Sequence, residues 1–253
     1  MRRVVLVLAT MALAILVACG VAQAIINGQP DRNAHPYVGM VYNDEFLCSG
    51  AVISPRVFLT AAHCTEFFEQ GDSKVYVTFE QRADFKPDDA YVGTPHTYPR
   101  RDGSFPDVGV VVLEKPVRLA TYGTLPERGL VDTLKEGQRL TTVGYGVRGS
   151  DRGSEPPLQS QPVLIKDRYR ATVRLLKTKP SVGDNFIKTT GASLIKGKGE
   201  TSCKGDSGGP LFVPDQQTIV GVTSLGSTPV CRGPTYYQRV DLPGVLKWVR
   251  SLP

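Results

Sequence analysis

Histidine and closely paired cysteines are scarce in this sequence of 253 residues. It has three histidines, five cysteines and no Cys-x-x-Cys spacing, and the acidic residues of segment 65–80 match no calcium-ligand spacing, so we predict no metal site and no cofactor. The net charge of +6 is spread along the chain without a basic stripe interleaved with aromatic residues, which argues against nucleic-acid binding. No repeat of fixed period occurs, and helical periodicity is rare. These absences favour a globular unit built mainly from strands.

Residues 1–24 have the layout of a secretory signal. Two arginines precede a short apolar run, and Ala22-Gln23-Ala24 supplies a small-residue cleavage site. The run is short for a membrane-spanning helix. We therefore predict export, with residues 25–253 as the mature chain and with a signal of bacterial type. The residues up to Cys19 also resemble a bacterial lipoprotein signal, so the alternative is a lipid anchor at Cys19, without which we expect no membrane attachment.

The mature chain keeps four cysteines, because Cys19 lies in the signal. They are Cys48, Cys64, Cys203 and Cys231. Four cysteines in an exported protein predict two disulfides, for which the sequence alone permits three pairings.

Short strand-like runs separated by glycine and proline dominate the mature chain. KVYVTFE alternates between apolar and other residues, VGVVVL is continuously apolar, and RLTTVGYG, TIVGVTSL and TYYQRV add further runs. Many short strands with intervening turns are typical of a sandwich or a barrel. The clearest helical pattern follows Pro243, where Val245, Trp248, Val249 and Leu252 share one face, and it predicts a closing helix over about 243–252.

The segment TSCKGDSGGPLF, residues 201–212, places Ser207 among glycines in a G-x-S-x-G pattern. The α/β-hydrolases use this pattern, but in them a helix follows the serine and the catalytic histidine comes later in the chain. Here two glycines and a proline follow, and all three histidines, His35, His63 and His96, precede Ser207. The chain order therefore excludes an α/β-hydrolase.

Of the three histidines, His63 has the surroundings best suited to a catalytic role, although an isolated histidine is more often a surface or structural residue. It lies in CSGAVISPRVFLTAAHC beside Cys64, after two apolar strand-like runs. A bridge between Cys48 and Cys64 would close a loop of the length that a disulfide stabilises by about 3 kcal/mol, and it would restrain the backbone of His63. His35 precedes a proline near the mature start, and His96 lies among polar residues and prolines.

With these residues in this order, the sequence resembles the trypsin/chymotrypsin family of serine peptidases. The resemblance rests on IINGQP, CSGAVISPRVFLTAAHC, DVGVVVL, CKGDSGGPL, SLG before Cys231, and a tryptophan-bearing terminal segment. It implies an all-β chymotrypsin-like fold of two perpendicular six-stranded antiparallel β-barrels with a short C-terminal helix. The barrels would span about 25–121 and about 137–240, with the active site in the cleft between them.

The resemblance also implies a catalytic triad. His63 would be the general base, Asp107 its orienting carboxylate and Ser207 the nucleophile. The backbone N–H groups of Gly205 and Ser207 would form the oxyanion hole, which stabilises the charge that develops on the substrate carbonyl.

The residues themselves support Asp107 only in part. It precedes the most apolar strand, where an ionised carboxylate needs a partner such as an imidazole N–H. By composition alone, Asp84 and Asp102 are equally eligible.

A free N-terminus at Ile25 is the next feature that the resemblance implies. In the family, the α-amine of the first mature residue pairs with the carboxylate that corresponds to Asp206. Cleavage after Ala24 would itself create this N-terminus. We therefore hypothesise that export and activation are the same cut.

The substrate-binding residues also follow from the resemblance. Thr201 would lie at the base of the primary specificity pocket, where an aspartate would select Lys or Arg. Ser224, Leu225 and Gly226 would form the pocket wall and pair with an extended substrate. Thr235 stands where many relatives have glycine and would narrow the pocket. Because a neutral pocket holds a cation poorly, we predict a preference for small to medium uncharged residues before the scissile bond.

The resemblance further implies the disulfides Cys48–Cys64 and Cys203–Cys231, the second of which would tie the pocket wall to the nucleophile loop. We therefore predict a secreted, monomeric serine endopeptidase that hydrolyses polypeptides through an acyl-enzyme. The alternative is a catalytically silent binding protein of the same fold, since a fold does not determine a function.

Overall fold

The computed structural model describes residues 25–70, 74–84, 86–99, 106–146, 165–176, 183–192, 199–214, 217–226, 228 and 231–253. The predicted signal segment 1–24, which includes Cys19, lies outside these ranges, as do Asp102 and the side chain of Asp84. Within the described ranges, no helix has both the length and the apolar composition that crossing a membrane requires.

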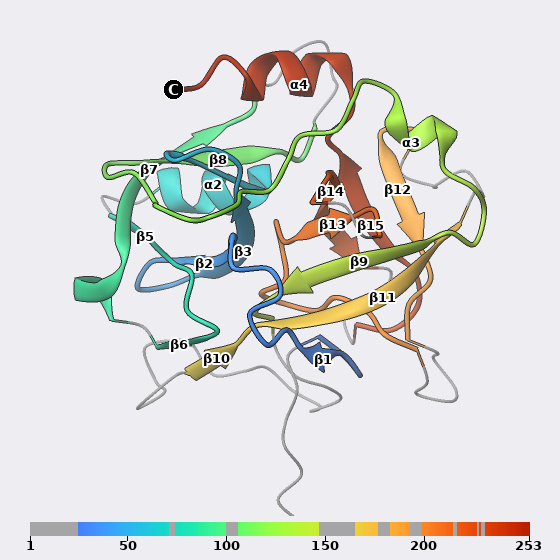
Figure 1. Ribbon diagram of the computed structural model, residues 1–253, viewed down its shortest axis with the longest axis horizontal. Helices are drawn as coiled ribbons and strands as arrows, with labels where there is room; N and C mark the ends of the chain where they lie inside the picture. The colour runs from blue at the N-terminus through green and yellow to red at the C-terminus, as the bar shows by residue number, and fades with distance from the viewer. Residues whose placement is uncertain are drawn as a thin grey trace, which may run out of the picture.

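The first part of the described chain closes into a six-stranded antiparallel β-barrel, in the order β2-β3-β4-β8-β7-β5 (Figure 1, blue to green). Val75 and Val77 are fully buried while Tyr76 between them is partly exposed, which is the alternation that the sequence predicts. The strands are β2 (Val38–Tyr42), β3 (Leu47–Val52), β4 (Val57–Thr60), β5 (Val75–Thr78), β7 (Tyr91–Thr97) and β8 (Gly109–Leu113).

A second ring of strands follows. The sheet has the order β1-β11-β12-β15-β14-β13-β9, and an additional pairing of β11 with β9 closes six of its seven strands, while β1 remains at the edge (Figure 1). The strands are β1 (Gln29–Pro30), β9 (Arg139–Gly144), β11 (Tyr169–Leu176), β12 (Phe186–Thr189), β13 (Pro210–Phe212), β14 (Ile219–Gly226) and β15 (Thr235–Arg239). The prediction of an all-β fold with two six-stranded rings is thus confirmed.

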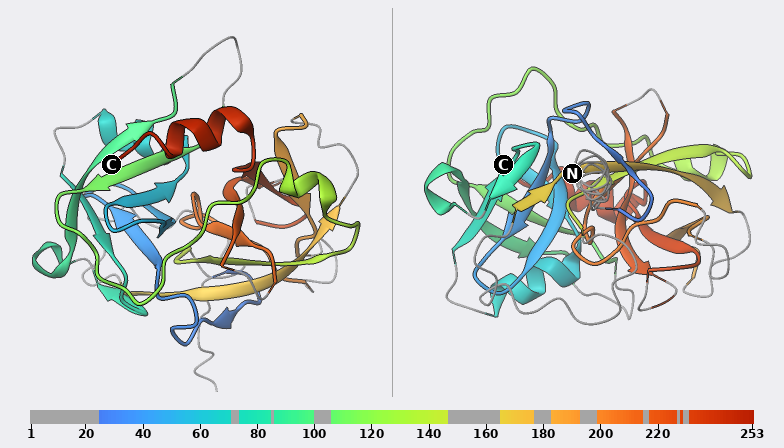
Figure 2. Two further views of the ribbon diagram at one scale, coloured as in Figure 1. Left: turned by 45° about the horizontal axis from the view of Figure 1, so that its top comes forward. Right: turned by 90° about the horizontal axis from the view of Figure 1, so that it is seen from below.

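The short elements connect and cover the two rings. Helix α4 (Pro243–Val249) begins at a proline, as predicted, but it ends three residues before the end that the periodicity indicates. It packs back on the first barrel (Figure 2), and its buried side chains join that barrel's core. The ring of Trp248 contacts that of Tyr98 edge to face, with centroids 5.2 Å apart. The short elements that connect and cover the rings are β6 (Arg82–Asp84), η1 (Pro87–Asp89), β10 (Ile165–Asp167), α2 (Ala62–Glu69), α3 (Leu130–Thr133) and α4 (Pro243–Val249).

Helix α2 (Ala62–Glu69) was not predicted from the sequence. It has only eight residues, and its buried side chains include the polar Thr65 as well as Ala62, Cys64 and Phe68. A segment this short, with a polar residue on its inner face, carries little periodic signal.

A fully buried arginine, Arg168, joins the N-terminal segment to both rings. Its Nε donates to Asp31, which is also fully buried, at 3.0 Å. Its Nη1 donates to the carbonyl of Val38 on β2 at 2.8 Å and to the hydroxyl of Tyr145, just after β9, at 3.1 Å. His35 completes the network through Asp31, and these bonds orient the segment that leads away from Ile25.

Candidate active site

Helix α2 and the residues that lead into β8 bring His63 and Asp107 together. The Nδ1 atom of His63 lies 2.9 Å from Oδ2 and 3.1 Å from Oδ1 of Asp107. The backbone N–H of His63 donates to the same carboxylate at 2.9 Å. Asp107 therefore determines both the backbone position and the ring orientation of the histidine, and it leaves Nε2 as the nitrogen that faces away from the carboxylate.

Asp107 has two further partners from the second ring. The Ser224 hydroxyl donates to its Oδ2 at 2.5 Å, and its backbone N–H donates to the Gln238 side chain at 3.0 Å. Burial raises the pKa of Asp107, but the hydrogen bond and charge of His63, together with the Ser224 hydrogen bond, outweigh burial and leave the pKa below its usual range. Asp107 is therefore an anion at neutral pH.

The loop that carries Ser207 adopts a conformation that requires glycine at two positions. Gly205 has φ +87° and Gly208 has φ +76°, both in the left-handed region. A Cβ atom at Gly208 would lie 2.0 Å from Oγ1 of Thr60. These constraints explain the run of glycines around the serine.

Ser49 of strand β3 anchors this loop from the first barrel. Its hydroxyl donates to the carbonyl of Gly205 at 2.8 Å and accepts the N–H of Tyr145 at 2.9 Å, and its own N–H donates to the carbonyl of Ser207 at 2.8 Å. The carbonyl groups of Gly205 and Ser207 are thus occupied. Among the described residues, no acceptor binds the backbone N–H of Gly205 or of Ser207, so both amides can bind a substrate oxygen.

Ser207 and His63 line neighbouring parts of one cleft. A pocket of about 540 Å³ contains His63 and Asp107, a second of about 360 Å³ contains Ser207, and both include Ser224 and Leu225. Among the hydrogen bonds of the described residues, none joins the Ser207 hydroxyl to His63. Such bonds are often long in a free enzyme and shorten when substrate binds.

The 360 Å³ pocket contains four of the five predicted substrate-binding residues, namely Ser224, Leu225, Gly226 and Thr235. The fifth, Thr201, is buried and does not line the open space, but its Oγ1 lies 2.7 Å from Oγ1 of Thr235. The part of the pocket wall at Thr235 is therefore backed by a second uncharged side chain. The disulfide Cys203–Cys231 also lines it.

One edge of the strand that ends at Gly226 has no partner strand in the described chain. Leu225 and Gly226 pair with β15 on one side, whereas β13 pairs with β14 only as far as Val222. The other edge of residues 224–226 can therefore accept an extended peptide as an added strand.

No hydrogen bond or ion pair of the described residues joins Asp206 to Ile25, the predicted activation pair. Asp206 is fully buried, and its carboxylate accepts the N–H groups of Gly146 and Cys203, each at 2.8 Å. Burial raises the pKa of Asp206 to about 7, although these two hydrogen bonds act to lower it. The Ile25 side chain packs with Tyr169 and Ala171. In this chain Ile25 is joined to Ala24, so its nitrogen is a peptide amide without charge.

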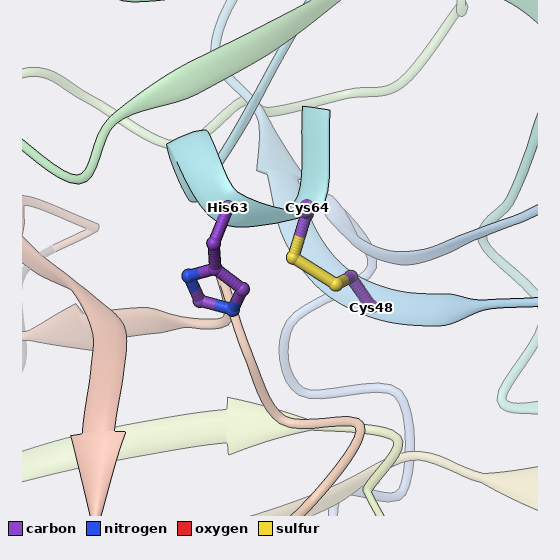
Figure 3. Close-up of side chains that lie close together, drawn as sticks. All are labelled: Cys48, His63 and Cys64. Atoms are coloured by element: carbon purple, nitrogen blue, oxygen red, sulfur yellow. A yellow bond between two sulfur atoms is a disulfide. The ribbon is translucent and has the colours of Figure 1, made fainter. Parts of the chain in front are cut away.

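Cys48, His63 and Cys64 place potential metal ligands within 4.8 Å of one another (Figure 3). The two sulfur atoms are bonded to each other in a disulfide, so neither is available as a thiolate ligand. The cluster is therefore a structural bridge beside the histidine, and the Cys48–Cys64 pairing is the one that the resemblance implies.

Two contacts of this site were not predicted from the sequence. Ser224 was expected only in the pocket wall, and Ser49 carries no pattern that singles it out. Neither has a local signal, because Ser224 meets a carboxylate 117 residues earlier and Ser49 meets a carbonyl 156 residues later.

Comparisons with known proteins agree with this geometry. The family model described as Trypsin matches residues 25–249. Serine protease 1 of Drosophila melanogaster is 30% identical over 248 residues, covering 90% of this chain and 84% of the relative. Kallikrein 1-related peptidase b3 of Mus musculus is 28% identical over 231 residues, covering 85% and 81%.

Two solved structures share the fold. HL collagenase has a TM-score of 0.67 at 19% identity and covers 90% of this chain and 97% of its own. Human heparin binding protein has a TM-score of 0.63 at 23% identity and covers 90% and 96%. The family match over nearly all of the described chain, together with the relatives that are named as proteases, identifies the activity. The chain belongs to the trypsin family and is a serine endopeptidase.

Proposed function

We propose that the protein is a secreted serine endopeptidase in which Ser207 is the nucleophile, His63 the general base and Asp107 the orienting carboxylate. The observation that carries this proposal is the His63–Asp107 pair, which shares one cleft with Ser207. The unoccupied N–H groups of Gly205 and Ser207 support an oxyanion hole in the same place.

In the proposed reaction, the Ser207 oxygen attacks the carbonyl carbon of a peptide bond while Nε2 of His63 takes the hydroxyl proton. The amides of Gly205 and Ser207 bind the oxyanion, and the Asp107 carboxylate stabilises the imidazolium. His63 then gives the proton to the departing amine, so that the C–N bond breaks and an acyl-enzyme remains. A water molecule, activated by His63, releases the acid and restores the serine.

For specificity, we propose that the residue before the scissile bond is small to medium and uncharged. The pocket of about 360 Å³ is lined by Thr235, whose hydroxyl meets that of the buried Thr201, and neither residue carries a charge to balance a buried Lys or Arg. The free edge of residues 224–226 supports pairing with the substrate backbone on the same side.

Export and activation complete the proposal. Residues 1–24 would be removed as a signal of bacterial type, residues 25–253 would form the peptidase domain, and the new α-amine of Ile25 would pair with Asp206. The relatives reported above come from an insect and a mouse, so bacterial origin rests on the layout of the signal alone. N-terminal sequencing of the secreted active protein would test this part, and a start at Cys19 would contradict it.

A fluorophosphonate probe tests the catalytic assignment. We expect it to label the protein that begins at Ile25 on Ser207, and we expect no labelling after Ser207→Ala. Profiling against a peptide library would then measure the preference before the scissile bond, and dominant cleavage after Arg or Lys would contradict the proposed pocket. A folded protein that neither reacts with the probe nor cleaves peptides would instead be a binding protein of this fold.

A further inference from the structure

A further cavity lies outside the candidate active site. It has a volume of about 400 Å³, and its lining residues are all different from those of the two pockets in the active-site cleft. Most of its wall comes from the N-terminal segment 29–37, which begins with β1 beside β11 (Figure 1), and from strands β9, β11 and β13. We refer to it as the β11 cavity. Its volume is in the range of cavities that bind small molecules.

One wall of the β11 cavity is the outer face of the second ring. Phe212 on β13 pairs with Thr141 on β9, and Thr141 pairs with Thr172 on β11. Directly opposed residues of antiparallel strands point to the same face of a sheet, so these three side chains form a row across it. Arg170 points to this face as well, because it lies two residues before Thr172 on the same strand. The other face, which carries Val173, is buried in the core of the ring.

Segment 29–37 supplies a second wall. The His35 ring stacks on Phe212, with ring centroids 5.2 Å apart and an interplanar angle of 15°. Nδ1 of His35 lies 2.5 Å from the buried Asp31 carboxylate, which is also paired with Arg168. These contacts leave Nε2 as the ring nitrogen that Asp31 does not bind. They also hold this wall in one position before a ligand arrives, which lowers the free-energy cost of binding.

Several hydrogen-bond donors of the β11 cavity have no partner among the described residues. No described residue forms a hydrogen bond or ion pair with the guanidinium of Arg170, or a hydrogen bond with the hydroxyl groups of Tyr37, Thr141 and Thr172. Only 3% of the Tyr37 surface is exposed, and a buried hydroxyl without a partner costs free energy. Burial and the charge of Asp31 raise the pKa of Tyr37 to about 12, so its hydroxyl stays protonated and can donate. These donors are available to the acceptor atoms of a ligand.

The β11 cavity also contains a carboxylate. Glu200 lines it, and one oxygen of Glu200 accepts the backbone N–H of Thr172, two residues from Arg170. Glu200 and Arg170 are both partly buried, and no ion pair of the described chain joins them. A ligand with one charge would leave the opposite group of the cavity unmatched, whereas a ligand with both charges satisfies the two groups together.

We propose that the β11 cavity binds a small zwitterion, whose carboxylate accepts from Arg170, whose ammonium donates to Glu200, and to which the Tyr37 hydroxyl also donates. Free amino acids and short peptides share this chemistry. The inference goes beyond the proposed endopeptidase function and does not depend on it, because no residue of the cavity belongs to the proposed catalytic site.

The experiment measures binding and not activity. It uses isotope-labelled protein that begins at Ile25 and carries Ser207→Ala, so that no probe is hydrolysed. Chemical-shift titrations with L-leucine and with the dipeptide Leu-Leu should move the backbone amides around Thr172, with dissociation constants in the millimolar range for ligands of this size. Tighter binding of leucine would identify free amino acids as the ligands, and tighter binding of the dipeptide would identify short peptides.

Two analogues of leucine test the two charges. Leucinamide lacks the carboxylate and 4-methylpentanoate lacks the ammonium, and each should bind about tenfold more weakly than leucine. Arg170→Gln and Glu200→Gln should each weaken leucine binding by about tenfold, because each removes a charge-assisted hydrogen bond. Tyr37→Phe should weaken it by about fivefold, since the lost hydrogen bond comes from a neutral donor. Glu200→Gln keeps an acceptor oxygen for the N–H of Thr172, so it tests the charge without removing this contact.

Arg139→Gln is the matched control, because Arg139 is an exposed arginine of the neighbouring strand β9 that does not line the β11 cavity. It should bind leucine as the native residue does. Unchanged binding in both Arg170→Gln and Glu200→Gln, or equal binding of leucine and 4-methylpentanoate, would overturn the inference. The absence of any shift with leucine and with Leu-Leu would overturn it as well. None of these results would bear on the labelling of Ser207 by a fluorophosphonate, which tests the proposed function separately.

Discussion

Freeing the α-amine of Ile25 should change how the stability of this protein depends on pH. The carboxyl of Asp206 is fully buried, and burial raises its pKa from an ordinary value of 3.8 to about 7. The amide hydrogen bonds from Cys203 and Gly146 lower the pKa but do not outweigh burial. Between about pH 4 and pH 7 the folded chain therefore binds more protons than the unfolded chain. Its free energy of unfolding should decrease as pH rises through this range.

The magnitude follows from the shift in pKa. One pKa unit corresponds to about 1.4 kcal/mol, so a shift of about three units removes roughly 4 kcal/mol of stability by pH 8. A free amine at Ile25, with an ordinary pKa near 8, would supply a cation to the Asp206 carboxylate and would lower its pKa instead. The chain that begins at Ile25 should then lose little or none of this stability.

Urea unfolding from pH 4 to pH 8 would measure the difference between two chains, both with Ser207→Ala to prevent self-digestion. One begins at Ile25 and the other carries a single additional glycine before it. Groups that titrate in both chains contribute equally to the two profiles of unfolding free energy against pH, so their contributions cancel in the difference. In the extended chain, Asp206→Asn should remove the decrease, because the amide does not titrate. Equal pH profiles for the two chains would refute the assignment of Ile25 and Asp206 as a pair.

Three further predictions concern single side chains. Asp107→Asn should lower kcat by about 10⁴ with little change in KM, because the imidazole would lose its tautomer and orientation; steady-state kinetics would measure this, and an unchanged kcat would exclude Asp107 from the triad. Thr201→Asp should introduce cleavage after Arg and Lys in a peptide library, since it adds a carboxylate beneath the pocket; continued rejection of these residues would contradict the position of Thr201. Arg168→Met should lower the free energy of unfolding by about 3–5 kcal/mol, because the buried Asp31 would lose its permanent cation and keep only His35 as a side-chain partner. Denaturant titration would test that value, and a loss below about 1 kcal/mol would show that His35 is a sufficient partner for Asp31.

Much of the fold class followed from the sequence, because strand alternation and turn residues are local. The alternating run around Tyr76 and the continuous run of β8 became barrel strands. The resemblance supplied the number of strands in each ring. Helix α2 was missed, since its eight residues bury a polar threonine and show little periodicity.

In the candidate site, too, some residues are marked by a local sequence pattern and others are not. Gly205 and Gly208 mark the nucleophile loop in the sequence, because the backbone there has positive φ and only glycine adopts it easily. Asp107 was one of three eligible aspartates by composition. It was distinguished by the family resemblance, and in the structure its carboxylate meets His63.

The sequence by itself determined the candidates for nucleophile and base, Ser207 among glycines and His63 beside a cysteine, and their order, because each depends on neighbouring residues that leave a recognisable pattern. The tertiary structure alone decided the contacts between the two rings. Ser224 meets Asp107, Ser49 holds the Gly205 carbonyl, and His35 stacks on Phe212. The physical reason is that these contacts join residues from separate strands, turns and helices, whose relative positions are determined by packing and strand register and not by any local pattern.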